Sequence, residues 1–210
     1  MSTAAGTATR TVLCAVILAI ASAGTPVRSA AQRIPSDRYD SYFKKYAKRY
    51  FGIGFDWKLF KAQGMAESGL SPTAKSWVGA RGIMQLMPST YHDISSHRPE
   101  MTSIDDPQWN IAAGIMHDRD MWALWKDSVP DDDRWRFMFG GYNAGEGTIF
   151  RAQGVAKASK LDHRAWPNIE SIAPNVPRWR YKETLGYVHT IEENRKRLSR
   201  STASRDSASP

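Results

Sequence analysis

The stretch Ala66–Thr90, AESGLSPTAKSWVGARGIMQLMPST, decides how this chain is interpreted. A helix from Trp57 to about Ser68, with Asp56 able to cap it and Gly69 as its stop, carries Glu67 in its last turn. A carboxylate there faces the negative end of the helix dipole, which opposes ionisation, and the apolar neighbours of Glu67 oppose it too. A carboxyl group that stays protonated near neutral pH is what a general acid requires. From the residues alone, an exposed and idle Glu67 remains as acceptable as a catalytic one.

The rest of the chain around this stretch is predicted to be helical. Residues 37–50 place aromatic side chains at spacings of three and four, with lysines on the other face. Asp106-Pro107 is a cap followed by proline, which opens a helix to about Trp125. Further helices are predicted from Asp131 to Asn143, closed by Gly145, and from about Arg178 to Leu198. Loops are predicted over 69–82 and 162–177, and Gly140-Gly141 is interpreted as close helix packing. No alternating strand pattern occurs, so the fold class is all-α with one domain.

Three ordered motifs resemble those of the soluble lytic transglycosylase (SLT) family, which cleaves peptidoglycan and has a goose-type lysozyme-like fold. They comprise Glu67-Ser68-Gly69-Leu70 with Ala74, Ser76, Gly79-Ala80, Gly82 and Met84–Pro88; Tyr142-Asn143-Ala144-Gly145 with Gly147; and Glu183-Thr184 with Tyr187-Val188. The resemblance spans about residues 37–193. It implies a single lysozyme-like helical domain, over 32–198 in our division of the chain.

The resemblance also implies roles by position. Glu67 would be the single acid/base, and Glu183 would lie behind the site in the final helix and support it. The sugar contacts would come from Ser76, Gln85, Met87, Tyr142 and Asn143. Packing and chain turning remain as alternatives: Met87 could be a core residue, Asn143 a helix terminator, and Glu183 a surface partner of Arg180 or Lys182.

The expected reaction depends on how many carboxylates take part in catalysis. Ordinary glycosidases use two, one as the acid and one as the nucleophile or as the base for water. With one, Glu67 would protonate the glycosidic oxygen of the MurNAc-GlcNAc β-1,4 bond and then take the proton of the C6 hydroxyl of N-acetylmuramic acid, closing a 1,6-anhydro ring. A phenol hydroxyl of Tyr142 could hold Glu67 in place for both steps. Simple hydrolysis stays open, because a second carboxylate could come from Asp105, Asp106, Asp162 or Glu170.

The start of the chain is predicted to be a secretory signal over residues 1–31. Its apolar run Val12–Ala23 is 12 residues long, against about 20 for a membrane-spanning helix, and it follows Arg10. An uncleaved anchor is the alternative. The only cysteine, Cys14, lies in this run, so a cleaved chain would lack thiol chemistry. We expect export to the periplasm or cell envelope.

The net charge and the histidines indicate which binding partners and ligands to expect. The formal net charge is +8, or +6 without residues 1–31, which favours an anionic wall or membrane surface as a peripheral contact; nucleic acid is not expected for an exported protein. Residues 199–210 are predicted to be a basic, Ser-rich disordered tail. The five histidines form no ligand pattern, so neither a metal site nor a cofactor is predicted. The expected partner is the peptidoglycan glycan strand, and a non-catalytic wall-binding or assembly protein is the alternative from another class.

Overall fold

The computed structural model describes residues 37–206, and the sequence predictions for residues 1–31, including Cys14, lie outside them. The described chain forms eight α-helices and one 3-10 turn, with no strand: α1 (Asp40–Phe51), α2 (Lys58–Ser68), α3 (Pro88–Ser95), α4 (Pro107–Leu124), α5 (Asp131–Ala144), α6 (Glu146–Ala158), α7 (Trp166–Ile172), η1 (Ala173–Asn175) and α8 (Tyr181–Asp206). The predicted all-α class is therefore confirmed for these residues.

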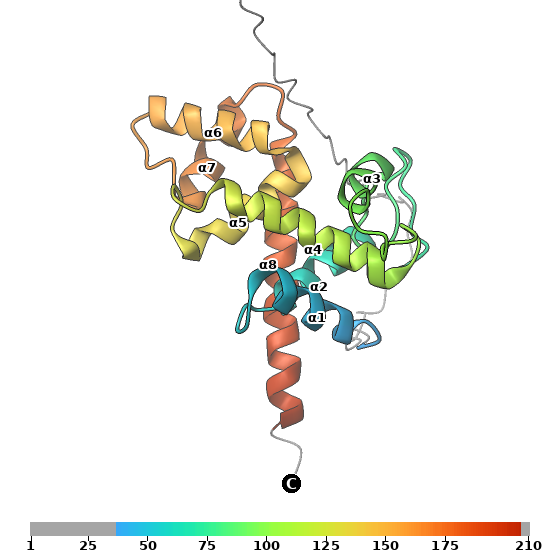
Figure 1. Ribbon diagram of the computed structural model, residues 1–210. Helices are drawn as coiled ribbons and strands as arrows, with labels where there is room; N and C mark the ends of the chain where they lie inside the picture. The colour runs from blue at the N-terminus through green and yellow to red at the C-terminus, as the bar shows by residue number, and fades with distance from the viewer. Residues whose placement is uncertain (1–36, 207–210) are drawn as a thin grey trace, which may run out of the picture.

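Helix α2 lies against α8 and also contacts α1. Helix α1 packs on α4, α4 on α5, and α5 on both α6 and α8. Figure 1 shows α6 and α7 at one end of the molecule and α3 with the 69–87 loop at the other, while α8 runs past the body to the C-terminus. No helix of the described segment is long and apolar enough to cross a membrane.

The capping and packing signals in the sequence account for much of this arrangement. The Asp106 carboxylate accepts hydrogen bonds from the backbone N–H groups of Gln108 and Trp109 at the start of α4. A Cβ at Gly140 would lie 2.6 Å from the Trp166 ring, and one at Gly141 would lie 2.9 Å from Trp125. The interpretation of Gly140-Gly141 as close packing is thus confirmed, since only glycine lets the two indoles approach α5.

Other boundaries were predicted wrongly. Helices α3, α6 and α7 were not predicted, and α7 with η1 occupies the segment 162–177 that was interpreted as a loop. Helix α8 begins at Tyr181 and continues to Asp206, past the expected end at Leu198. The segment predicted as a disordered tail from 199 is therefore helical as far as Asp206.

Candidate active site

Glu67 lies in the last turn of α2, as the sequence predicted. The helix ends at Gly69, whose backbone is left-handed (φ 63°) and whose N–H bonds to the carbonyl of Met65. The Ser68 hydroxyl donates to the carbonyl of Ile83 at 2.8 Å and so ties this end of the helix to the loop that follows. No basic residue occupies the last turn of α2 to offset the helix dipole at Glu67.

The surroundings of Glu67 favour its protonated form. The residue is only 9% exposed, and burial raises the pKa of its carboxyl group to about 8. The hydroxyl of Tyr187 in α8 donates to Glu67 Oε1 at 2.6 Å, which lowers the pKa but does not outweigh burial. Because Oε1 accepts this bond, the acidic proton belongs on Oε2. Oε2 is buried and has no partner among the described residues.

Tyr187 thus contacts Glu67, a contact that the sequence analysis expected from Tyr142. The Tyr142 hydroxyl donates to the backbone carbonyl of Met84 at 2.8 Å, and its ring lies 5.1 Å from that of His117. Tyr142 is 1% exposed, so it supports the loop from below. Its neighbour Asn143 is also buried, and its Nδ2 has no partner among the described residues.

A second buried acid lies behind Glu67. Gln63, one turn earlier on the same face of α2, donates from Nε2 to Asp118 Oδ1 of α4 at 3.1 Å. Asp118 has no exposed surface, and burial raises the pKa of its carboxyl group well above the usual range; the charge of Glu67 acts in the same direction. Burial therefore favours the protonated form of Asp118.

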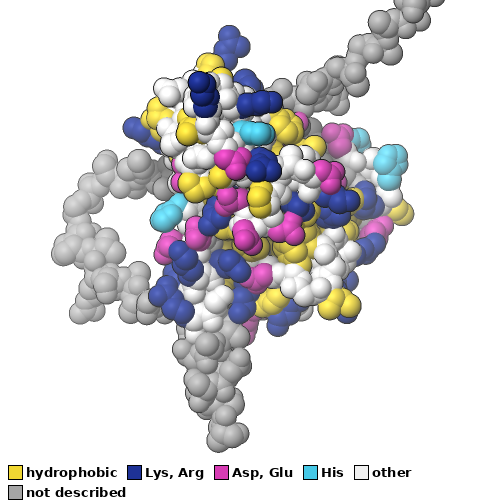
Figure 2. All heavy atoms as spheres, turned by 90° about the vertical axis from the view of Figure 1, so that its left-hand side faces the viewer, with side chains coloured by type: hydrophobic (Ala, Val, Ile, Leu, Met, Phe, Trp, Pro, Cys, Tyr) yellow, Lys and Arg dark blue, Asp and Glu magenta, His cyan; other side chains and the backbone are white. Residues whose placement is uncertain are grey.

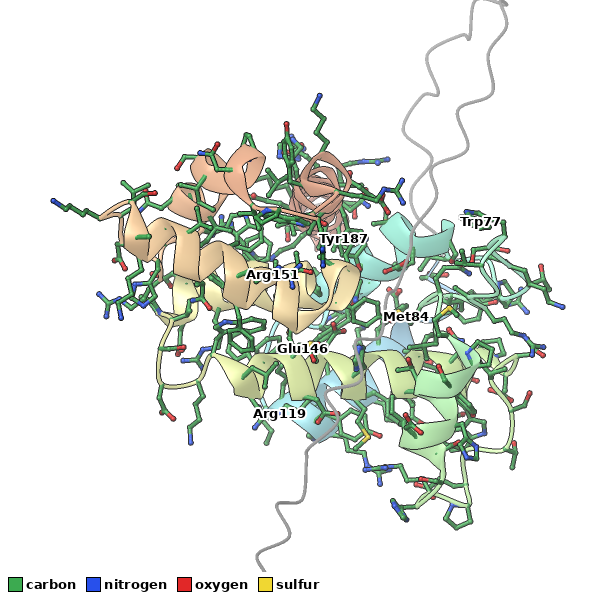
Figure 3. All side chains as sticks on the ribbon, turned by 90° about the horizontal axis from the view of Figure 1, so that it is seen from above. Trp77, Met84, Arg119, Glu146, Arg151 and Tyr187 are labelled. Carbon is green, nitrogen blue, oxygen red and sulfur yellow. The ribbon has the colours of Figure 1, made fainter. Side chains whose placement is uncertain are left out.

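The carboxylates named earlier as candidates for a second catalytic group have structural partners. Asp105 pairs with Arg81, Asp106 caps α4, Asp162 pairs with Arg164, and Glu170 accepts from the Trp166 indole at 2.9 Å. The sequence analysis did not consider Glu146, the first residue of α6, which is half-buried and has no hydrogen bond or ion pair with a described residue. In Figure 3, Glu146 and Arg151 lie on one side of Tyr187, and Met84 and Trp77 lie on the other.

The loop after α2 is held by its own polar residues. The Ser76 Oγ accepts from the backbone N–H of Ala80 at 3.0 Å, and Gln85 Nε2 donates to the carbonyl of Gly82 at 2.9 Å. Both residues predicted to contact sugar therefore also fix the loop, whereas Met87 is half-buried just before α3. Glu183 lies in the first turn of α8 and pairs with Arg180 at 3.0 Å, the alternative named for it above.

Asn110 of α4 anchors this loop, a role that sequence reasoning missed. Its Oδ1 accepts from the Met84 N–H at 2.8 Å, and its Nδ2 donates to the carbonyls of Arg81 (3.0 Å) and Ile104 (2.9 Å). Gly82 has φ 77° and packs so closely that a Cβ would lie 2.4 Å from Asn110 Nδ2. The available signal was that the polar residues Asn110 and Asp118 fall at helical spacings among the apolar residues of α4.

No group of three or more His, Cys, Asp or Glu side chains among the described residues is arranged to hold a metal ion. What Glu67 offers is a carboxyl group whose protonated form is favoured. One of its oxygens is fixed by a phenol, and the other is left to donate a proton.

Comparisons with known proteins point to one family. The chain is 29% identical to membrane-bound lytic murein transglycosylase F of Shewanella pealeana over 79% of its length, and 31% identical to the protein of that name from Maricaulis maris over 77%. It spans about a third of the length of these curated relatives, 33% of each.

Solved structures show the same fold. The 70 kDa soluble lytic transglycosylase SLT70 of Escherichia coli matches 80% of this chain with a TM-score of 0.63 and 24% identity, over 25% of its own length. An inactive mutant of lytic transglycosylase Slt from Pseudomonas aeruginosa matches 80% of this chain, over 25% of its own length, with a TM-score of 0.61 and 20% identity. The family model described as the transglycosylase SLT domain matches residues 41–164, more than half of the chain, and this protein therefore belongs to the SLT domain family.

Proposed function

We propose that this protein is a peptidoglycan lytic transglycosylase in which Glu67 is the single acid/base. The observation that carries the proposal is the state of Glu67: buried, with its pKa raised to about 8, and bonded through Oε1 to Tyr187. Such a group holds a proton at neutral pH and can deliver it from Oε2. The names of the relatives, lytic murein transglycosylases, support the same reaction.

The proposed reaction needs no water. Glu67 gives its proton to the oxygen of the MurNAc-GlcNAc β-1,4 bond as the bond between that oxygen and the anomeric carbon of N-acetylmuramic acid breaks. The C6 hydroxyl of the same sugar then attacks the anomeric carbon, and its proton passes to Glu67. This restores the acid and leaves a 1,6-anhydro end. Because the attack is intramolecular, it has a high effective molarity.

The carboxylates around Glu67 support a one-carboxylate mechanism. Asp118 has no exposed surface, and burial favours its protonated form, so it is poorly suited to attack the anomeric carbon as an anion or to activate water as a base. The four other acids considered from the sequence are engaged elsewhere in the fold. Glu146 has no such partner among the described residues, so it is the carboxylate whose role in hydrolysis we test.

Substrate contacts are proposed from the loop after α2 and from the end of α5. Ser76, Gln85, Met87 and Asn143 are expected to contact the sugars near the reacting bond, with Tyr142 behind them. Asn143 Nδ2 is a buried donor without a partner among the described residues, and a sugar oxygen would satisfy it. Glu183 is expected to support the start of α8 through Arg180.

The proposed location is outside the cytoplasm, in the periplasm or cell envelope, where peptidoglycan is found. A secretory signal over residues 1–31 remains part of this proposal. No cofactor is proposed.

Mass spectrometry of digested peptidoglycan tests the reaction. We expect products with anhydro ends, which are lighter by one water than hydrolysed ends, and no products from Glu67→Gln. Glu146→Gln should leave the anhydro ends unchanged. Loss of activity in Glu146→Gln together with hydrolysed ends in the wild type would establish a muramidase instead. Sacculus binding by a wild type that releases no product would establish a wall-binding protein.

A further inference from the structure

The loop between α1 and α2 presents the most exposed large apolar side chain of the described residues. Ile53 is 88% exposed and lies between Gly52 and Gly54, whose φ angles are 97° and 92°. A Cβ built on either glycine would meet nothing within 4 Å, so the turn stands clear of the body. The aromatic rings of Phe51 and Phe55, 4.4 Å apart, pack beneath it and give the turn a firm base.

Three lysines lie on α1, the helix that precedes this turn. Lys44, Lys45 and Lys48 are exposed, and none lies within ion-pair distance of a carboxylate in the described segment. Residues 44, 48 and 52 follow one face of a helix at intervals of four, so the basic face of α1 leads directly to Gly52. The Lys44 ammonium lies 4.9 Å from the centre of the half-buried Trp57 ring, on the other side of the turn.

Helix α8 lies beside the same turn. Arg195 Nε bonds to Asp56 Oδ2 at 2.7 Å, which fixes α8 there. The next residue, Lys196, is exposed and pairs with Glu192 and Glu193. Figure 2 shows Lys and Arg side chains, with some Asp and Glu, gathered where α8 leaves the body of the molecule.

We propose that this surface, formed by Lys44, Lys45, Lys48, Ile53 and Trp57 and called here the Ile53 surface, docks on an anionic phospholipid bilayer. Unpaired lysines are attracted to anionic headgroups, and an apolar tip beside an indole ring suits the boundary between headgroups and acyl chains. An anionic wall polymer would be attracted to the lysines, but it offers no apolar phase for Ile53. The combination therefore favours a bilayer.

The position of the surface fits such a role. The turn precedes the first residue of α2, and Glu67 lies in the last turn of the same helix. Eleven residues separate the two ends of α2 by about 16 Å. A molecule docked through Ile53 would hold Glu67 away from the bilayer. The proposal concerns residues outside the site and does not depend on the proposed reaction.

Sedimentation with lipid vesicles tests the docking. The full chain is mixed with phosphatidylcholine vesicles that do or do not contain about a third phosphatidylglycerol, at 0.1 M salt. We expect binding to the anionic vesicles to fall at least about tenfold in Ile53→Ser and roughly a hundredfold when Lys44, Lys45 and Lys48 become Gln. Leu161→Ser, and a triple change of Lys126, Lys157 and Lys160 to Gln, are the matched controls and should bind like the wild type.

A probe at position 53 separates docking by this surface from any binding through residues 1–36. Ile53→Cys in a Cys14→Ser background carries an environment-sensitive fluorophore, and Leu161→Cys carries the same label as control. Anionic vesicles should shift the emission of the first label to the blue and leave the second unchanged. Equal loss of binding in the control triple would overturn the proposal, as would an unshifted label at 53. A lysine triple that binds vesicles normally but loses binding to purified sacculi would instead assign the surface to the wall.

Discussion

At the scale of single residues, the chemistry depends on what surrounds one carboxyl group. The sequence predicted that Glu67 would end a helix and resist ionisation, and the raised pKa confirms the direction. It could not identify Tyr187 as the partner, because that contact joins positions 120 residues apart and depends on how α8 packs on α2. In the sequence, Tyr187 was singled out only as part of the third motif, with Glu183-Thr184. The bond that we expected from Tyr142 to Glu67 stays a prediction, and the Tyr142 hydroxyl donates to the carbonyl of Met84.

Replacement of Glu67 by Gln tests the acid directly. Glutamine keeps the size of the side chain and can still accept from Tyr187, but it has no proton to deliver. We expect peptidoglycan cleavage to fall by at least about 10²–10⁴-fold, while the circular dichroism spectrum stays that of the wild type. Turnover close to wild type in the purified variant would remove Glu67 from the mechanism.

The same variant shows the pKa shift as a change in stability. The pKa of Glu67 is about 8 in the folded protein, against 4.5 for the free side chain, so the native state binds the extra proton between these values. The contribution of Glu67 to the free energy of unfolding is thus full below about pH 4.5 and is lost as pH rises towards 8. Relative to Glu67→Gln, the wild type should lose on the order of 2–4 kcal/mol over this range, measured by urea unfolding at several pH values. Parallel pH curves for the two proteins would mean that Glu67 ionises normally.

Replacement of Tyr187 by Phe separates the two tyrosines. The Tyr187 hydroxyl both orients Glu67 and lowers its pKa, so Tyr187→Phe should slow turnover by about 10- to 100-fold and move the alkaline limb of the kcat/KM profile to higher pH. Tyr142→Phe leaves the Met84 carbonyl without this donor and should lower the free energy of unfolding by about 1–2 kcal/mol. The alkaline limb of its kcat/KM profile should stay at the pH of the wild type. A limb that moves in Tyr142→Phe and not in Tyr187→Phe would reverse the assignment.

At the scale of elements, predictions succeeded where local signals were strong. Asp106-Pro107 opened α4, and Gly69 and Gly145 ended α2 and α5. Helix α7 was missed because Pro167, in its first turn, was interpreted with Pro174 and Pro177 as a loop signal. Helix α6 was missed because Gly145 ends α5 and begins α6 with no connecting residues, a junction that depends on tertiary packing.

The side chain of Asn110 in α4 holds the loop after α2, and removing this side chain should lower the free energy of unfolding. Asn110 is 1% exposed, and Asn110→Ala removes three hydrogen bonds, which leaves the Met84 N–H and two carbonyls without these partners. We expect a loss of about 2–4 kcal/mol in urea unfolding and a higher KM, because the loop carries Ser76 and Gln85. Asn194→Ala, which removes a single 3.3 Å bond from another buried asparagine, should cost clearly less. Equal losses would show that the loop does not depend on Asn110.

At the scale of the whole molecule, the site is assembled from distant parts of the chain. Helix α2 carries Glu67, α8 carries the phenol that bonds to it, and α4 and α5 carry side chains that hold the loop. The three motifs predicted the parts from α2, α5 and α8 in order but not Asn110 of α4, and the contacts among these parts come from packing between elements. Helix α8 shows how far the sequence could predict the elements. Its first turns lie at the site, as the third motif indicated, while its last turns continue beyond the body, past the predicted end of the helix (Figure 1).

The net positive charge of the whole chain leads to the last prediction, which concerns binding to the cell wall. Peptidoglycan sacculi carry carboxylates, and the formal charge of the protein is +8, so long-range attraction should contribute to binding. The Debye length falls from about 10 Å at 0.1 M salt to about 3 Å at 1 M, which screens exposed charges but leaves hydrogen bonds to sugars in place. Binding of Glu67→Gln to purified sacculi, measured by co-sedimentation so that no wall is digested, should therefore weaken several-fold over this range without being abolished. Binding unchanged by salt would mean that the charge has no part in holding the wall, and that short-range contacts in the site account for all of the affinity.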